Sequence, residues 1–413
     1  MKKETDMSGR NAVDRREFLI TSAGIMAAGI GQACSAATPE EIERGAVAVG
    51  KLPRRPLGRD GREVSVLIGA STWSADAVQA GIRCGVNYWH KSEDWGSNVP
   101  RAILKDRDAH YCQVCVDRVR GNHERGQIDE EAHYQFVKSA LEQTGLRYFD
   151  DMQLHFGYHH VAEQKSNRGF VRAFERLKKE GLVRHLCLSQ HHYAENSRVE
   201  AGQNAAEILT AVVQDGVFEH AQFMYSYGET EPMKELVSLA RRNGFGTIAM
   251  KTTRGAGRMK NDAEFMKQFP ADTSPHQALA RWLTTMTELD AAVVQITSLS
   301  EFVDTFSGAG RPVRSADAQA LERMTAYADR EVCRLCNECA SHCQLGIPIA
   351  DILRYERYAQ DYGEDLRARA LYALLDRQGD SCIACGNCLP HCKQQLEIPR
   401  KLAAAHQILR IKG

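Results

Sequence analysis

The sequence predicts an α/β chain in which a (β/α)8 barrel is followed by a small all-helical domain. Across residues 51–315, eight short apolar runs alternate with amphipathic stretches, which is the pattern of repeated βα units. Farther along the chain, apolar residues recur at helical spacing over 349–359 and 366–375. This change of pattern indicates a second domain over 325–413.

The candidate strands are short, and most are followed by helical spacing. They cover 64–69, 87–90, 111–116, 150–155, 185–189, 221–224, 246–251 and 292–296. The stretch 170–181 is a typical helix, with Phe170, Phe174 and Leu177 on one face and Gly181 as a C-cap. Because active sites of such barrels lie at the carboxyl ends of the strands, side chains there are the candidates for chemistry.

Two cysteine runs with the spacing C-x2-C-x2-C-x3-C lie in the second domain. The first contains Cys333, Cys336, Cys339 and Cys343, and the second contains Cys382, Cys385, Cys388 and Cys392. This spacing is typical of iron-sulfur ligands, and in two-cluster proteins the fourth cysteine of each run ligates the other cluster. We therefore expect two [4Fe-4S] clusters that exchange Cys343 and Cys392. A pair of zinc sites is the alternative, although zinc motifs usually separate short cysteine arms by a longer spacer.

The repeat continues past the cysteines. His342-Cys343 is followed by Ile347-Pro348, and His391-Cys392 is followed by Ile398-Pro399. We expect each proline to start a helix, because its missing N–H costs nothing there. The stretch between the runs is too long for the compact βαββαβ ferredoxin, so the domain resembles the all-helical two-cluster ferredoxins.

The N-terminus has the pattern of an export signal. Arg15 and Arg16 stand in the stretch DRREFLI, a moderately apolar segment covers 20–30, and small residues follow at 35–37. We interpret 1–37 as a twin-arginine (Tat) signal peptide and 38–50 as a linker. The Tat translocase carries folded proteins, which suits a protein whose clusters must be inserted before export, and the expected location is the periplasm.

Composition narrows the choice of partner. The 53 basic residues balance the 53 acidic ones, which argues against nucleic acid. A small-molecule substrate and an electron-transfer protein or quinone-linked partner are the better expectations. Four further cysteines, Cys84, Cys112, Cys115 and Cys187, are expected to be buried packing thiols.

Several blocks of the barrel region resemble aldo/keto reductases in order and spacing. The blocks are 55–65, 85–89, 148–150, 154–155, 177–185, 249–251 and 278–282, and the first of them looks like the opening hairpin of that family. The chain resembles a subgroup of the family that carries a twin-arginine leader and a ferredoxin-type tail. The resemblance implies a carbonyl-reducing scaffold.

The catalytic tetrad of that family is only partly present. His155 matches the family histidine, whereas the Asp position aligns with His90, the Tyr position with Trp95, and the Lys position falls near Cys115. Tyr to Trp removes the acidic O–H, because an indole N–H is not an acid at working pH. Carbonyl reduction by the usual route of the family is therefore not expected.

The nicotinamide contacts are also only partly kept. By resemblance, Ser189, Gln190, Gln222 and Ser298 stand at cofactor-binding positions, but no Arg or Lys follows Ser298 closely enough to clamp a 2′-phosphate. The sequence thus gives weak support for NAD(P).

Histidines and cations gather at the strand ends instead. His155, His90 and Lys251 are the candidate catalytic residues. Other polar side chains at this end are Lys91, His159, His160, His191, His192 and Arg254. A metal site built from some of these histidines stays open as an alternative.

These observations predict an exported iron-sulfur oxidoreductase that passes electrons to or from a small carbonyl-type substrate in the barrel. Two alternatives remain. One is an NAD(P)H-dependent reductase with a modified tetrad, and the other is a non-catalytic barrel that acts as an electron carrier for a redox partner.

Overall fold

A computed structural model describes residues 37–93, 98–116, 128–155, 157–158, 160–190, 205–229, 231–267 and 269–411. The chain divides into two units at Thr38/Pro39, and the second unit, Pro39–Gly413, contains both the barrel and the cysteine-rich region. The predicted signal peptide lies almost entirely outside the described residues. Within the described ranges, no helix is both long and apolar enough to cross a membrane.

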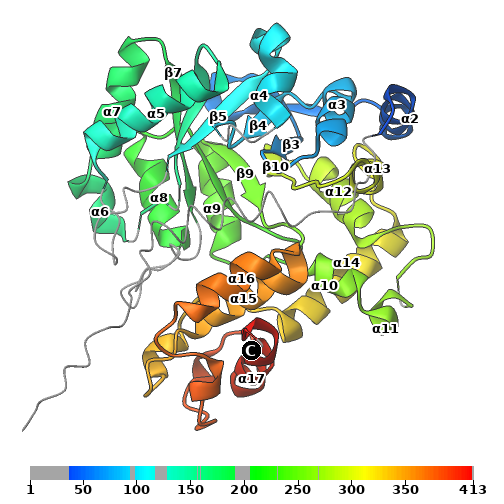
Figure 1. The fold of residues 1–413 in the computed structure, drawn as a ribbon, viewed down its shortest axis with the longest axis vertical. Helices are drawn as coiled ribbons and strands as arrows, with labels where there is room; N and C mark the ends of the chain where they lie inside the picture. The colour runs from blue at the N-terminus through cyan, green and yellow to red at the C-terminus, as the bar shows by residue number, and fades with distance from the viewer. Residues whose placement is uncertain are drawn as a thin grey trace, which may run out of the picture. The chain divides into compact units, whose positions relative to one another are not determined.

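Eight parallel strands close into a barrel, as the sequence predicted (Figure 1). In chain order they are β3 (Leu67–Ala70), β4 (Tyr88–His90), β5 (Tyr111–Val116), β6 (Phe149–Leu154), β7 (Val183–Gln190), β8 (His220–Met224), β9 (Gly246–Met250) and β10 (Ala291–Val293). β10 pairs with β3 and with β9, which completes the ring. One expected strand, 64–69, is in fact the end of a hairpin strand and the start of β3. The break falls at Val66, whose N–H bonds the carbonyl of Pro53 at 3.0 Å.

An antiparallel hairpin closes the amino-terminal end of the barrel. It consists of β1 (Arg54–Leu57) and β2 (Arg62–Ser65), joined by the turn η1 (Gly58–Asp60). Gly58 has φ +57°, and a Cβ there would approach the amide nitrogen of Gly246 to 2.7 Å, so glycine is required at this contact. Both Nη atoms of Arg62 donate to the buried Asp151 carboxylate at 2.9 Å inside the barrel. The hairpin therefore leaves the carboxyl ends of the strands as the accessible end.

Helices surround the barrel. They are α3 (Ala75–Cys84), α4 (Asn98–Ile103), α5 (Glu130–Thr144), α6 (Val161–Ser166), α7 (Gly169–Lys179), α8 (Ala205–Asp215), α9 (Met233–Arg242), α10 (Ala256–Lys260), α11 (Ala263–Met266), α12 (Pro275–Thr285), α13 (Leu299–Phe306) and α14 (Ser315–Glu331). Helix α7 illustrates why the spacing of apolar residues predicted a helix. It buries Phe170, Phe174 and Leu177. Its C-cap is Glu180, one residue before the expected Gly181, which has φ +73° while the N–H of Leu182 bonds the carbonyl of Leu177 at 3.0 Å.

Residues 39–49, expected to be a linker, form helix α2 (Pro39–Val49) instead. Its buried side includes Ile42, Ala46 and Val49, and it packs against α3 and α13. A Cβ on Gly45 would lie 3.1 Å from the side chain of Val303 in α13, so the two helices approach closely. The apolar face of this segment explains why it packs rather than staying extended.

The cysteine-rich region is helical, as expected. Helices α15 (Ile349–Tyr362), α16 (Asp365–Ala373) and α17 (Ile398–Leu409) lie together in Figure 1. Short turns η3 (Ala340–His342), η4 (Gly379–Ser381) and η5 (Leu389–His391) connect them to the cysteines. Their shared core contains Ile352, Tyr355, Tyr372, Leu402 and Leu409, all buried.

A buried ion cluster joins this region to the barrel. Arg258 of α10, which follows β9, donates to Asp361 at 2.9 Å and to Glu356 at 3.0 Å, and both carboxylates belong to α15. Any Cβ on Gly257 would clash with the carbonyl oxygen of Asp361. Lys401 of α17 also donates to the carbonyl oxygen of Glu331 at 2.8 Å. The cysteine-rich region is therefore tied to loops at the carboxyl end of the barrel.

Arg258→Met should lower the free energy of unfolding by about 3–5 kcal/mol, because it leaves Glu356 buried without its cation and leaves Asp361 with Arg357 alone, at 3.5 Å. Denaturant titration of the anaerobically prepared protein measures this change. Arg176→Met is the matched control, since Arg176 pairs with Glu130 and Glu131 at the exposed surface of α7, where solvent screens the pair, and its loss should be much smaller. Equal losses in the two variants would contradict a structural role for the Arg258 cluster.

Candidate functional site

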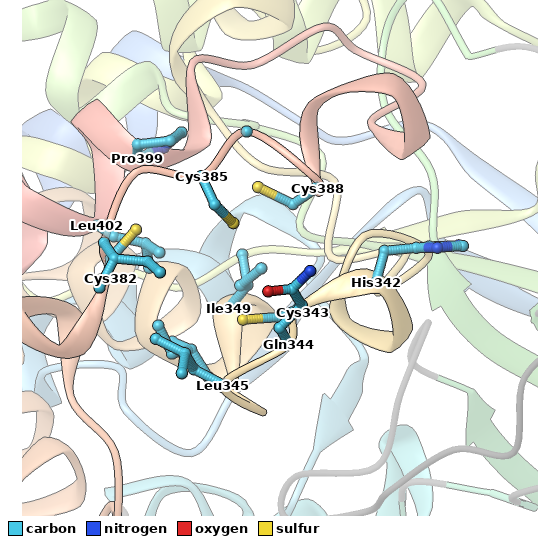
Figure 2. Close-up of a pocket in the computed structure, with 13 residues that line it drawn as sticks. His342, Cys343, Gln344, Leu345, Ile349, Cys382, Cys385, Cys388, Pro399 and Leu402 are labelled. Carbon is cyan, nitrogen blue, oxygen red and sulfur yellow. The ribbon is translucent and has the colours of Figure 1, made fainter.

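The eight motif cysteines gather in two groups of four, each with three thiols from one run and one from the other. Burial raises the pKa of the Cys339 thiol, and the neighbouring Cys333, Cys336 and Cys392 raise it further. The pKa of Cys388 is likewise raised, first by burial and then by Cys382, Cys343 and Cys385. Figure 2 shows the sulfurs of this second group around one space. When the fourth cysteine of each run ligates the other cluster, each cluster has three cysteines from one run and one from the other, as in these two groups.

The two ligand loops have equivalent backbone hydrogen bonds. The N–H groups of His342 and His391 each bond the carbonyl of the cysteine three residues earlier, at 3.3 Å. Their imidazole rings stack with centroids 3.2 Å apart and planes 2° apart. The internal repeat seen in the sequence is thus a structural duplication.

Left-handed backbone shapes both loops. Leu335 and Asn337 have φ +60° and +59°, and the equivalent Ala384 and Gly386 have φ +53° and +80°. Such a conformation costs a residue such as leucine or alanine roughly 1 kcal/mol or more, so the surrounding structure must favour it. The amide N–H of Leu335 points at the sulfur of Cys333 at 3.3 Å.

The surroundings of the thiols suit iron-sulfur clusters. Each group supplies four thiolates, the ligand set of a [4Fe-4S] cluster. Apolar side chains enclose the second group, including Leu345, Ile347, Ile349 and Leu402. Amide N–H groups aimed at sulfur and an apolar shell are the features by which a protein tunes such a cluster.

The prolines after the two loops do not occupy equivalent positions, contrary to the sequence-based expectation. Pro348 is the N-cap of α15, whereas Pro399 lies in the first turn of α17 and Glu397 occupies the N-cap. The apolar residues set the register, because Ile349 and Ile398 each donate to the carbonyl two residues earlier at 2.8 Å. Both prolines still sit where a missing N–H leaves no helical bond unmade.

At the barrel mouth, the positions aligned with the reductase tetrad come together. Nδ1 of His90 lies 2.5 Å from Oε1 of Gln113 and 3.6 Å from Sγ of Cys115. Desolvation lowers the pKa of His90 to about 3, with His155 nearby lowering it further and Gln113 opposing the shift. His90 is therefore neutral at pH 7. Trp95 lies outside the described residues.

The predicted nicotinamide contacts are partly used by the protein itself. The amide of Gln190 donates to the carbonyl of Tyr158 at 3.0 Å and accepts from its N–H at 3.1 Å. Ser298 caps α13, accepting from the N–H of Glu301 at 3.2 Å. Ser189 is buried opposite Gln222, whose Oε1 has no hydrogen-bond partner in the described part of the chain.

Lys251 belongs to a pocket that the sequence did not reveal as a unit. The pocket is lined by residues at the ends of β8 and β9 and by residues of the cysteine-rich region: Met224, Tyr225, Ser226, Glu229, Lys251, Arg254, Cys333, Arg334 and Arg357. Neither His90 nor His155 is among these lining residues. His159, His191 and His192 lie outside the described residues. The only sequence sign of the pocket was that Arg334 follows a motif cysteine directly.

The four remaining barrel cysteines are buried, as expected for packing thiols. Cys84, Cys112, Cys115 and Cys187 are each at most 3% exposed. Burial raises the pKa of Cys84 to about 11 and that of Cys112 to about 12. Burial also raises the pKa of Cys187, and none of the described cysteines forms a disulfide.

Comparison with solved structures finds aldo-keto reductases. An aldo-keto reductase from Bacillus halodurans, in its holo form, is 16% identical with a TM-score of 0.49, and the match covers 66% of this chain and 96% of that one. An aldo-keto reductase enzyme from a Medee basin deep-sea metagenome library is 16% identical (TM-score 0.46, 66% and 94% covered). An aldo/keto reductase from Brucella melitensis is 17% identical (TM-score 0.46, 66% and 100% covered).

No family model matches the sequence, and no curated protein matches it. The solved structures are similar to this chain in their barrel, and their low identity leaves its activity to be argued from the site.

The exchanged grouping predicts which double variants lose one cluster and which lose two. Cys336→Ala combined with Cys392→Ala removes two ligands of one group, so about half of the iron should remain. Cys388→Ala combined with Cys392→Ala removes one ligand from each group, so most of the iron should be lost. Iron and sulfide analysis with EPR after anaerobic purification measures both. The opposite order of iron loss would show that each run binds its own cluster, and stoichiometric zinc without iron would contradict the cluster assignment.

Proposed function

We propose that this protein is an exported iron-sulfur oxidoreductase that acts on a small carbonyl-type substrate at the mouth of the barrel. When bound, the two [4Fe-4S] clusters would supply or accept single electrons through the ligands Cys333, Cys336, Cys339 and Cys392, and Cys382, Cys385, Cys388 and Cys343. A periplasmic electron-transfer protein or a quinone-linked partner would exchange electrons with them.

One observation carries this proposal. Cys333, a ligand candidate, lines the same pocket as Tyr225, Ser226 and Lys251, which follow the carboxyl ends of β8 and β9. In (β/α)8 barrels this end holds the active site. The Arg258 contacts to α15 hold the two regions in this arrangement.

The polar side chains have separate tasks in the proposal. His155 is the proton donor to the substrate oxygen, because the low pKa of His90 leaves that ring neutral. His90 contributes a hydrogen bond and is oriented by Gln113. Lys251 and its neighbouring cations favour negative charge at the other side of the barrel mouth.

The nicotinamide alternative receives less support from the geometry. Gln190 and Ser298 use their polar atoms on the backbone of Tyr158 and Glu301. Titration with NADPH tests this alternative directly: saturable binding with hydride transfer would favour it over the proposal.

His155→Gln should lower turnover about 10²- to 10⁴-fold, the usual contribution of a general acid, and leave the iron content unchanged. Turnover is measured anaerobically with reduced viologen as electron donor and a panel of aldehydes and 2-oxo acids. His185→Gln is the control, because His185 pairs with Glu219 at 2.8 Å away from the carboxyl end of its strand. Full activity of His155→Gln would favour a non-catalytic electron carrier.

Arg15→Lys combined with Arg16→Lys should block export, because the twin-arginine pair is read by the translocase. Cell fractionation should then find the protein, with its iron, in the cytoplasm. Arg10→Lys is the control for a nearby basic residue outside the pair. Unchanged periplasmic accumulation of the double variant would exclude this route.

A further inference from the structure

We propose that the pocket between the ends of β8 and β9 and Cys333 is a carboxylate-binding site, and that Arg254 grips the carboxylate of the substrate. The inference rests on the proposed function and narrows its substrate to small carbonyl compounds that carry a carboxylate, such as 2-oxo acids. It concerns binding alone, so it can be tested apart from turnover.

Arg254 is the residue that carries the inference. Its side chain is 10% exposed and lines the pocket. One nitrogen, Nη2, donates to Asp329, while Nε and Nη1 are buried and have no hydrogen-bond partner in the described part of the chain. A buried charged donor without an acceptor is costly. The two nitrogens lie on different sides of the guanidinium, because the Nε–H points to the side of Nη2, so each can offer one separate charge-assisted hydrogen bond to an anion.

The charge of the pocket also favours an anion. Its lining includes four cations, Lys251, Arg254, Arg334 and Arg357, and one carboxylate, Glu229. Desolvation lowers the pKa of Arg254, and the nearby charge of Arg334 lowers it further, while Asp329 and Glu229 oppose the shift. A bound anion would relieve both the desolvation and the repulsion between the two arginines.

A simpler explanation is that these cations only balance the charge of the thiolates. Arg357 fits that explanation, because the neighbouring Cys333 raises its pKa. Arg254 differs in its contacts: Nη2 donates to Asp329, while Nε and Nη1 are buried without an acceptor in the described part of the chain.

The backbone holds Arg254 in an uncommon conformation. Lys251 and Arg254 have φ +55° and +30°, and both belong to the turn that follows β9. Next to them, a Cβ on Gly255 would lie 2.7 Å from the side chain of Val332, the C-cap of α14. Strain of this kind persists only where neighbouring structure enforces it, and it is concentrated at binding and catalytic sites.

The test uses the iron-loaded protein with pyruvate as probe and pyruvamide as the uncharged counterpart. Isothermal titration should show saturable binding of pyruvate and much weaker binding of pyruvamide. Arg254→Gln should weaken pyruvate binding about 10- to 100-fold, the value of hydrogen bonds to a charged group. Arg254→Lys should fall between, because it keeps the charge and loses the fixed planar array of donors. In the same samples, pyruvate should alter the EPR spectrum of the reduced protein.

Arg168→Gln is the matched control, because it also breaks an arginine-carboxylate pair, with Asp215 at 2.9 Å, outside the pocket. The inference is overturned if pyruvate does not bind saturably, if Arg254→Gln binds it as the parent protein does, or if inorganic phosphate binds more tightly than pyruvate. If one of these results is obtained while His155→Gln still lowers turnover, only the carboxylate site is rejected and the proposed function is retained. Conversely, Arg254-dependent binding in a protein without turnover would support the site and reject the proposed reaction.

Discussion

Arg258 lies between two carboxylates of α15, and Gly257 beside it lets the two backbones meet. Because Asp361 and Glu356 are both at most 9% exposed as side chains, neither can be left without its cation at low cost. The contact therefore holds the cysteine-rich region against the loops that follow β9. The pocket that contains Cys333, Lys251 and Arg254 depends on this placement.

The barrel mouth and the cysteine-rich region each contribute candidate functional residues. The barrel offers the positions where its fold usually holds reacting groups, with His90, Cys115 and His155 gathered at adjacent strands. The cysteine-rich region contributes Cys333 and two arginines that face the barrel.

Left-handed backbone occurs on both sides of the junction between the two regions. Residues other than glycine adopt it at Lys251 and Arg254 on the barrel side and at Leu335 and Asn337 on the cysteine side, and farther away at Lys91, Ala384 and Gln395. Each of these conformations is unfavourable by itself, so each requires support from the packing around it. The ion pairs of Arg258 and Lys401 supply such support at the edges of the junction.

Local sequence patterns predicted much of the fold of this protein. Most of the strands, the left-handed glycine after α7 and the spacing of the eight cysteines follow from period, turn chemistry and ligand spacing, all of which act over a few residues. The opening hairpin was expected only from the resemblance to aldo/keto reductases. Long-range packing decided the rest. Helix α2 packs against α3 and α13, and the side chain of Gln190 hydrogen-bonds the backbone of Tyr158. Pro399 lies in the first turn of α17 and not at its N-cap. Arg254 and Arg334 lie far apart in the sequence and meet only in the folded chain. No local rule brings two like charges together, because their meeting depends on the ion pairs and close contacts that join the two regions.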